Sequence, residues 1–195
     1  MAKLKSPHRP ATPEDAHALA ELLNMAGDGM PEYLWEGMAE PGQTAWDVGR
    51  YRASNKEKGF YRNATVREED GRVVAALIGY PLQRDPEPVD YVSMPSMFVP
   101  LQQLEELVPG TWYVNVLATY PEHRGKGYGQ TLLDIATKKA RTTGRSGLSL
   151  IVSDSNTGAR RLYERYGFSE IATKPMVKEN WENAGQNWVL LAMDI

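Results

Sequence analysis

The 195-residue sequence contains no cysteine. This absence excludes disulfides, thiolate-bound metals and a cysteine nucleophile, and it is compatible with a reducing compartment. The sequence also has no apolar run near the roughly 20 residues that a membrane-spanning helix needs. Its first fifteen residues lack the apolar segment of a signal peptide. We therefore expect a cytoplasmic protein without a membrane-embedded part.

Histidine is scarce as well, with three residues in the whole chain. The best metal-like spacing joins Glu14, His17 and Glu21 along one predicted helix. A solvated helix face explains this spacing more simply, so we predict no metal site.

The net charge is −3, which gives no general sign of nucleic-acid binding. Between residues 122 and 165, however, nine basic residues stand against four acidic ones, so this segment carries a net charge of +5. A local basic segment in an acidic protein favours a small polyanion as ligand. We expect neither nucleic acid nor a membrane as partner.

The pattern along the chain indicates a single domain over residues 1–195. Residues 12–15, Thr-Pro-Glu-Asp, are typical of a helix start, and that helix should end near Gly27. Short helices and a loop are expected over residues 28–60. Two strand-like runs then surround an Asp-Gly pair at 70–71, which is the signal of a two-residue hairpin turn.

Residues 81–110 contain six prolines, so most of this segment cannot form regular structure. Within it, only the run LQQLEEL, residues 101–107, predicts a helix. A long irregular segment in a compact domain is often functional. The elements expected after it are a strand over 111–119, a helix over 130–142, a strand over 148–152, a helix ended by Gly167 and a last strand over 188–193. This order predicts a mixed sheet with helices on its faces.

The stretch YPEHRGKGYGQTLL, residues 120–133, follows a predicted strand. A glycine-rich turn between a strand and a helix start can bind an anion, because unpaired backbone amides converge there and the helix dipole adds positive potential. The dinucleotide pattern G-x-G-x-x-G fails because Gln130 stands where its last glycine belongs, and a Walker A loop fails because Gly-Lys-Ser/Thr is absent. The pattern that fits is Arg-x-x-Gly-x-Gly, at Arg124, Gly127 and Gly129.

Together with the preceding LATYP and the downstream SDSNTGARRLYERYGF, this pattern resembles the GNAT superfamily of acyl-CoA-dependent N-acyltransferases. These proteins have an asparagine after a strand and, seven residues on, a tyrosine in a helix that ends in Gly-Phe. Here the two residues are Asn156 and Tyr163, and the resemblance covers residues 111–168. It implies an α/β (α+β) fold with a mixed, mostly antiparallel central sheet flanked by helices, and a Pro-rich insertion over 81–110 between the third and fourth strands.

The resemblance also implies a role for each matching residue. Backbone groups of residues 117–119 would bind the pantetheine arm of acetyl-CoA, with an amide near Leu117 polarising the thioester carbonyl. The glycine loop would wrap the pyrophosphate. Asn156 would hold the pantetheine arm or cap the next helix, and Tyr163, unless it only packs in the core, would donate a proton to the departing thiolate. The expected cofactor-binding residues are Leu117, Ala118, Thr119, Arg124, Gly125, Lys126, Gly127, Tyr128, Gly129, Gln130 and Asn156.

The sequence leaves the general base open. Relatives often place a glutamate or histidine on the strand before the glycine loop, where this chain has Tyr113 and Asn115. An unperturbed tyrosine, with a pKa of about 10, is a poor base at neutral pH. A water held by these two residues, or an acid of the insertion such as Asp90, could serve instead. The ribosomal-protein N-terminal acetyltransferases carry a glutamate five residues before the asparagine, where this chain has Ile151, which argues against that assignment.

The resemblance predicts an enzyme that transfers an acetyl group directly from acetyl-CoA to a primary amine of a small molecule or peptide, in a ternary complex with Tyr163 as general acid. A non-catalytic acyl-CoA-binding or regulatory module is the alternative, and a nucleotide-binding module of another type is a third. The insertion and the aromatic residues between Tyr33 and Tyr51 are expected to line the acceptor site. The acidic remainder of the chain favours a cationic amine. Assembly as a homodimer is left open.

Overall fold

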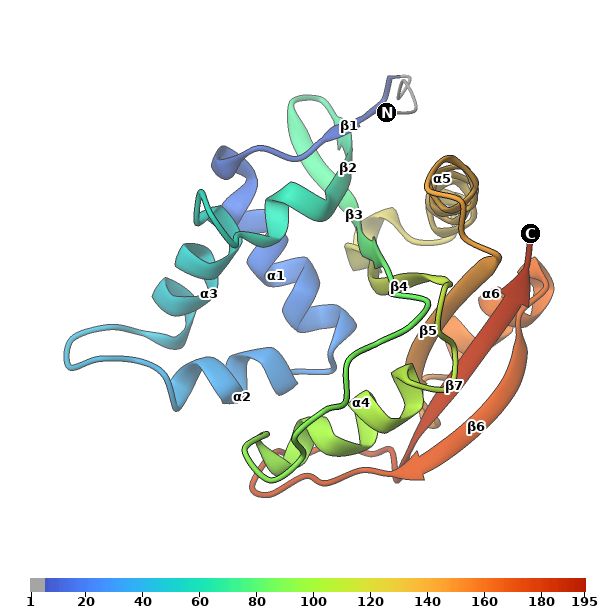
Figure 1. Ribbon diagram of the computed structural model, residues 1–195. Coiled ribbons are helices and arrows are strands. Elements are labelled where there is room, and N and C mark those ends of the chain that lie inside the picture. Colours follow the sequence, from blue (N-terminus) through green and yellow to red (C-terminus); the bar gives the residue numbers. More distant parts are fainter. Residues whose placement is uncertain (1–5) are drawn as a thin grey trace. The chain divides into compact units, whose positions relative to one another are not determined.

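The computed structural model describes residues 6–195 (Figure 1). Its contacts divide the chain into two compact units. The first unit comprises Tyr80–Asn115 and Leu133–Ile195, and the second comprises the residues up to Gly79 together with Val116–Leu132. The expectation of a single domain over residues 1–195 stays a prediction.

Seven strands form one sheet in the order β1-β2-β3-β4-β5-β7-β6. The pair β4–β5 is parallel, whereas β1–β2, β2–β3, β5–β7 and β6–β7 are antiparallel. These pairings confirm the predicted mixed, mostly antiparallel sheet. The strands are β1 His8–Pro10, β2 Ala64–Glu69, β3 Arg72–Pro81, β4 Trp112–Thr119, β5 Gly147–Ser153, β6 Ser169–Pro175 and β7 Asn187–Asp194.

Three helices of the second unit follow β1, namely α1 Ala16–Ala26, α2 Met30–Glu36 and α3 Ala45–Ser54. A short 3-10 turn, Pro13–Asp15, precedes α1, and the Asp15 carboxylate accepts the backbone N–H of Thr12 at 2.8 Å. This cap explains why the helix starts where the sequence predicted. Leu19 and Leu22 of α1 are fully buried in a core that includes Val66 of β2. The short helices expected over 28–60 are confirmed.

The β2–β3 hairpin confirms the Asp-Gly prediction. Asp70 and Gly71 both have left-handed backbone angles, φ +49° and φ +74°. Two successive residues of this kind form the tight turn whose twist matches that of paired strands. The turn therefore fixes the register that places Glu69 at the end of β2.

The helices that lie wholly in the first unit are α4 Val99–Glu105 and α6 Thr157–Tyr166, and α5 Tyr128–Thr142 enters it from the second unit. Helix α4 contacts β5, β6 and β7. The helix predicted over 101–107 in fact begins two residues earlier, because Pro100 occupies the first turn, where a proline costs no hydrogen bond. Helix α5 also begins two residues before the predicted Gln130.

Two strands, β1 and β6, were not predicted. Strand β1 has three residues and ends in a proline, so it has no detectable alternation. Strand β6 has no fully buried position, so its sequence lacks the apolar period of two. No helix within residues 6–195 is long and apolar enough to cross a membrane.

Gly147, the first residue of β5, allows close pairing with β7. A Cβ atom at this position would lie 2.2 Å from the carbonyl oxygen of Met193. We predict that Gly147→Ala destabilises the protein by about 1–3 kcal/mol, because the backbone must move to relieve this overlap. Thermal unfolding should show a fall of roughly 2–4 °C per kcal/mol.

The matched control is Gly158→Ala in the first turn of α6, where a Cβ atom would meet nothing within 4 Å. Its melting temperature should stay unchanged or rise, because alanine favours the helix over glycine. An unchanged melting temperature in Gly147→Ala would show that β5 and β7 are not held this closely.

Candidate active site

The glycine loop of the second unit exposes unpaired backbone amides. Gly125 and Gly127 have φ values of +75° and +79°, which residues with a side chain rarely adopt. Helix α5 begins at Tyr128, and the Thr131 amide is the first to find a carbonyl partner, that of Gly127 at 3.1 Å. In the described part of the chain the amides of residues 128–130 have no such partner. This arrangement is suited to an anion.

Glu69, at the end of β2, holds residues at both ends of this loop. Its carboxylate accepts a hydrogen bond from the Tyr128 hydroxyl, and it lies 3.3 Å from Nδ1 of His123. Arg67 forms an ion pair with Glu69 at 2.8 Å and stacks over the Tyr128 ring at 3.8 Å. The hydrogen bond from Tyr128, followed by the one from Arg67, lowers the pKa of Glu69 to about 2. The β2–β3 hairpin therefore braces the glycine loop through one ionised carboxylate.

Arg124 turns back toward its own strand. Its Nε donates to the Thr119 carbonyl at 3.1 Å, and its Nη2 lies 3.3 Å from the sulfur of Met25. Lys126 is exposed on the loop, with its Nζ 3.4 Å from Nδ1 of His123. Arg124 therefore ties the loop to the end of β4, and Lys126 is an exposed cation of the loop beside His123.

The half of β4 that precedes the loop alternates as predicted. Val116 and Ala118 are buried in the core of the second unit, whereas Leu117 and Thr119 are half-buried. The main-chain groups of residues 117–119 were expected to bind the pantetheine arm, and this role stays a prediction.

Aromatic side chains and a carboxylate gather in the first unit. Tyr80 of β3 and Tyr113 of β4 pack with their ring centroids 5.5 Å apart. The Tyr80 hydroxyl donates to Oε2 of Glu105, at the end of α4, at 3.3 Å. Trp112 lies on the opposite face of β4, toward α5, where Lys139 Nζ is 6.0 Å from its ring. Tyr113 and Asn115 share the other face because strand residues alternate.

Burial sets the protonation states in this cluster. It raises the pKa of Tyr113 well above the usual value for tyrosine, with further contributions from Tyr80, Glu105 and Tyr163. It also raises the pKa of Tyr80, and the negative charge of Glu105 adds to this effect. These phenols therefore stay protonated at neutral pH. They can donate hydrogen bonds but cannot act as bases.

The two acids of the segment between β3 and β4 that could serve as a base differ in basicity. Burial raises the pKa of Glu105, although the hydrogen bond from Tyr80 opposes the effect. Asp90 is exposed, and hydrogen bonds from Ser93 and from the Val92 amide lower its pKa. Asp90 is therefore the weaker base of the two. The sequence reasoning missed Glu105, although it lies in the run that predicted a helix.

Tyr163 lies in the middle of α6 with 7% of its surface exposed, and burial raises its pKa. Its ring packs edge-on against Phe168, with centroids 5.8 Å apart. Gly167, at φ +116°, ends the helix and turns the chain so that Phe168 can make this contact. Within residues 6–195 the Tyr163 hydroxyl makes no hydrogen bond. It is thus a protonated, unpartnered donor.

Asn156 caps α6, with its side-chain oxygen accepting the Ala159 amide at 3.2 Å. The cap, one of the two roles considered for this residue, is therefore present. Of the predicted site residues, the first unit contains Tyr113, Asn115, Asn156 and Tyr163, and the second contains residues 117–119 and 124–130. The two phenols of the first set are protonated donors, and the glycine loop of the second set has free backbone amides.

Two of the three residues considered for a metal lie close together. His17 Nε2 lies 3.2 Å from Glu21 Oε1, and Glu21 also accepts a hydrogen bond from the Tyr120 hydroxyl. Among residues 6–195 no group of three or more potential ligand side chains could hold a metal ion.

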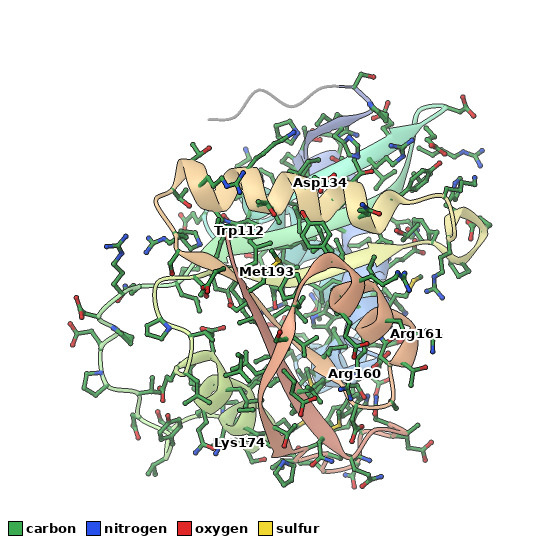
Figure 2. All side chains as sticks on the ribbon, turned by 90° about the vertical axis from the view of Figure 1, so that its right-hand side faces the viewer. Trp112, Asp134, Arg160, Arg161, Lys174 and Met193 are labelled. Carbon is green, nitrogen blue, oxygen red and sulfur yellow. The ribbon has the colours of Figure 1, made fainter. Side chains whose placement is uncertain are left out.

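Helix α6 displays basic side chains on its outer surface, as Figure 2 shows for Arg160 and Arg161. Arg160 forms an ion pair with Glu170 at 2.8 Å, whereas Arg161 and Arg165 are exposed. The interpretation of these arginines as a solvated face agrees with this placement.

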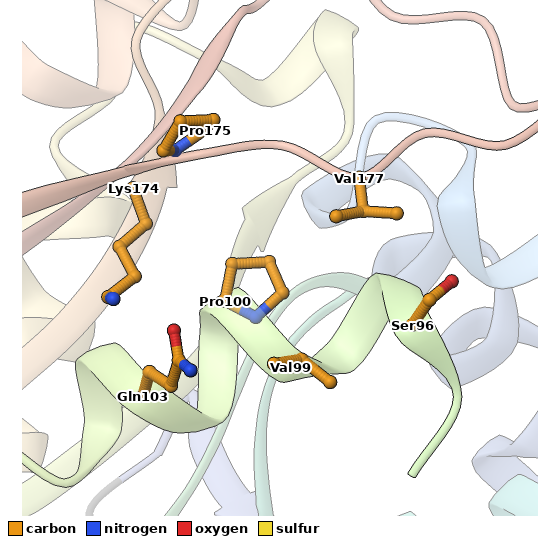
Figure 3. Close-up of a pocket in the computed structure, with 7 residues that line it drawn as sticks. All are labelled: Ser96, Val99, Pro100, Gln103, Lys174, Pro175 and Val177. Carbon is orange, nitrogen blue, oxygen red and sulfur yellow. The ribbon is translucent and has the colours of Figure 1, made fainter. Parts of the chain in front are cut away.

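A separate groove of about 390 Å³ lies between α4 and the end of β6 (Figure 3). Gln103 and Lys174 point toward one another across it. Val99, Pro100 and Gln103 share one side of α4, and the helical period places Glu105 on the other side. The groove is therefore distinct from the Tyr80–Glu105–Tyr113 cluster. Its lining residues are Ser96, Val99, Pro100, Gln103, Lys174, Pro175 and Val177.

The model of the acetyltransferase (GNAT) family matches residues 28–168, and the chain belongs to this family. A Methanocaldococcus jannaschii protein described as an uncharacterized N-acetyltransferase is 26% identical over 149 residues, 76% of this chain. An acetyltransferase of Agrobacterium fabrum is 27% identical over 129 residues, which are 66% of this chain and 72% of that protein. The match spans only 60% of the length of the Methanocaldococcus protein.

Solved structures show the same fold. A crystal structure of an acetyltransferase aligns with a TM-score of 0.63 at 22% identity, over 96% of this chain and 98% of that chain. An N-acetyltransferase from Staphylococcus aureus Mu50 aligns with a TM-score of 0.61 at 20% identity, over 95% and 99% of the two chains. A Bacillus anthracis acetyltransferase in complex with acetyl coenzyme A has a TM-score of 0.50 at 13% identity, over 73% and 71% of the two chains.

The Glu69 contacts predict a specific dependence of stability on pH. Because the pKa of Glu69 falls from its ordinary 4.5 to about 2 in the folded protein, its contribution to stability is present above pH 4.5 and is lost as the pH falls toward 2. We predict that Glu69→Gln lowers the free energy of unfolding at neutral pH. The difference from the wild type should narrow below pH 4.5.

Urea unfolding of both proteins at several pH values between about 6 and 3 measures this difference. Glu68→Gln is a useful comparison, because Glu68 pairs with Arg9 and not with the glycine loop. If the difference in the free energy of unfolding between wild type and Glu69→Gln stays constant over this pH range, Glu69 does not have the lowered pKa assigned to it.

Proposed function

We propose that the protein transfers an acetyl group from acetyl-CoA to a primary amine of a small molecule or peptide, in a ternary complex with Tyr163 as general acid. The observation that carries this proposal is the state of Tyr163. The phenol is protonated, its hydroxyl makes no hydrogen bond within residues 6–195, and its oxygen is not fully buried, so the hydroxyl can donate to a ligand. Because the chain belongs to the acetyltransferase family, we propose the departing CoA thiolate as the group that the Tyr163 hydroxyl meets.

The glycine loop would bind the pyrophosphate of acetyl-CoA. The free amides of residues 128–130 and the left-handed glycines before them provide the donors and the room that a phosphate needs. Lys126 would add positive charge at the same loop. A structural neighbour crystallised with acetyl coenzyme A supports this choice of ligand. Backbone groups of residues 117–119 and the side chain of Asn156 would hold the pantetheine arm.

The chemistry would be a direct transfer. The amine nitrogen attacks the thioester carbonyl carbon, a C–N bond forms, and the C–S bond then breaks. Tyr163 would give its proton to the departing sulfur, and its raised pKa ensures that it carries this proton at neutral pH. The absence of cysteine agrees with a route that forms no acyl-enzyme on a thiol.

The acceptor is proposed to be a cationic primary amine, on the basis of the negative charge outside residues 122–165. The segment between β3 and β4 contributes Glu105 and is the proposed acceptor side of the site. A cytoplasmic location is proposed from the cysteine-free sequence. A homodimer stays a prediction.

Tyr163→Phe tests the proposed general acid. We predict that it lowers kcat by ~10²-fold or more, because the thiolate then leaves without a proton donor, and that acetyl-CoA affinity stays nearly unchanged. The control is Tyr166→Phe, because Tyr166 lies on the same helix, three residues after Tyr163. This change removes a hydroxyl that is hydrogen-bonded to Thr137 and Asp134. Its kcat should remain close to that of the wild type.

Release of the CoA thiol in the presence of a panel of primary amines measures these rates. Equal rates in Tyr163→Phe and wild type would refute the assignment of Tyr163. A wild type that binds acetyl-CoA but acetylates none of a broad amine panel would favour a non-catalytic acyl-CoA-binding module.

The identity of the cofactor can be tested separately by thermal unfolding with saturating acetyl-CoA, CoA, ATP or NAD. At a hundredfold excess over the dissociation constant, binding adds about 2.7 kcal/mol, or roughly 5–10 °C for a chain of this size. We predict such a shift with acetyl-CoA and CoA. A shift with ATP or NAD alone would mean that the glycine loop binds a different nucleotide.

A further inference from the structure

The Tyr80–Glu105–Tyr113 cluster has no role in the binding of acetyl-CoA proposed above. Its three side chains come from β3, α4 and β4, all within the first unit. Two are aromatic rings in contact, and the third is a carboxylate that accepts a hydrogen bond from one of the hydroxyls. A carboxylate beside two aromatic faces is a suitable environment for an ammonium group, which gains both from charge pairing and from the ring quadrupoles.

The cluster also contains an unpartnered donor. Tyr113 is buried, with 7% of its surface exposed, and its hydroxyl makes no hydrogen bond within residues 6–195. The hydroxyl oxygen is not among the fully buried side-chain atoms that lack a partner, so solvent or a ligand can reach it. Asn115 follows on the same face of β4 and is exposed, so this face leads from the buried cluster to solvent.

Glu105 is the sole member of the cluster that can accept a proton, because both phenols stay protonated. The neighbouring glutamate on α4, Glu106, is engaged elsewhere, as its carboxylate accepts a hydrogen bond from the Tyr91 hydroxyl. Lys174 of β6 lies on the groove side of α4, away from Glu105. The groups that face Glu105 are therefore two neutral phenols, with the charge of Glu106 nearby.

We propose that Glu105 is the general base of the acetyl transfer and that the Tyr80–Glu105–Tyr113 cluster binds the ammonium group of the acceptor. The inference rests on the proposed function and deepens it, because it names the proton acceptor and the residues that bind the ammonium group of the acceptor. The acceptor is a primary amine that arrives protonated and places its ammonium group beside the Glu105 carboxylate.

These groups account for every proton that moves in the reaction. The acceptor ammonium gives one proton to the Glu105 carboxylate and becomes a neutral amine, whose lone pair attacks the thioester carbon. After the C–S bond breaks, the thiolate takes the proton of Tyr163. The amide nitrogen then loses its second proton, which restores the Tyr163 phenol directly or through water, and Glu105 returns its proton to solvent.

The environment of Glu105 fits this task. Burial raises its pKa above the ordinary value for glutamate, which brings it closer to that of the amine it must deprotonate. The hydrogen bond from Tyr80 works in the opposite direction and favours the ionised carboxylate. The two effects together favour a base that is charged before the reaction and accepts a proton during it.

The experiment compares wild type, Glu105→Gln, Glu106→Gln and Tyr80→Phe with benzylamine, n-hexylamine and spermidine as probes. CoA release is followed from about pH 6 to 10, and acetyl-CoA binding is checked by thermal shift. Glu105→Gln keeps an acceptor for the Tyr80 hydroxyl, so its fold should persist. We expect its kcat/KM at neutral pH to fall by ~10²-fold or more. The loss should shrink as the pH nears about 10, where the amine is neutral in solution.

Each control separates catalysis from structure. Glu106→Gln should change the rate by less than about threefold, since it removes a neighbouring charge only. Tyr80→Phe should move the acidic limb of the pH–rate profile to higher pH, because the hydrogen bond that stabilises ionised Glu105 is gone. A merely structural role of Tyr80 would leave this limb in place.

Three results would overturn the inference. A wild-type pH–rate profile in Glu105→Gln would exclude Glu105 as the base. If the wild type binds acetyl-CoA but acetylates none of the three probes, the ammonium site is wrong, while Tyr163 could still serve another acceptor. If the wild type shows no thermal shift with acetyl-CoA, the proposed function fails, and the assignment of Glu105 fails with it.

Discussion

The alternation of side chains along β4 is the constraint on which the candidate site depends. Because a strand turns successive residues to opposite faces, burying Trp112 and Val114 on one face commits Tyr113 and Asn115 to the other. The same strand then leads into the glycine loop through one short 3-10 helix, Pro121–His123. A shift of one residue in its register would exchange the two faces, and the phenol of Tyr113 would be replaced by an indole.

Desolvation has opposite consequences for the acids and the phenols of the first unit. It raises the pKa of Tyr80, Tyr113 and Tyr163, so these phenols keep their protons. It also raises the pKa of Glu105, which makes this carboxylate a better proton acceptor. One apolar environment thus produces donors and an acceptor side by side.

The elements predicted from the sequence are those fixed by near neighbours. The Asp70-Gly71 turn, the glycine that ends α6 and the alternation of β4 each depend on a few adjacent residues. The glycine loop was found because its pattern recurs in a family. The Tyr80–Glu105 contact could not be predicted, because it joins residues 25 positions apart across a proline-rich segment with no periodicity. The sequence of α4 does not reveal which of its sides meets the sheet.

Gly167 shows how a residue without a side chain can influence the chemistry of its neighbour. At φ +116° it turns the chain so that Phe168 packs against the Tyr163 ring. This backbone angle is easily accessible only to glycine. Under the role proposed for Tyr163, natural selection on its hydroxyl would therefore also act on position 167, which has no side chain. Among relatives of this protein, a change at this glycine would mark a lineage in which the tyrosine has lost its fixed orientation.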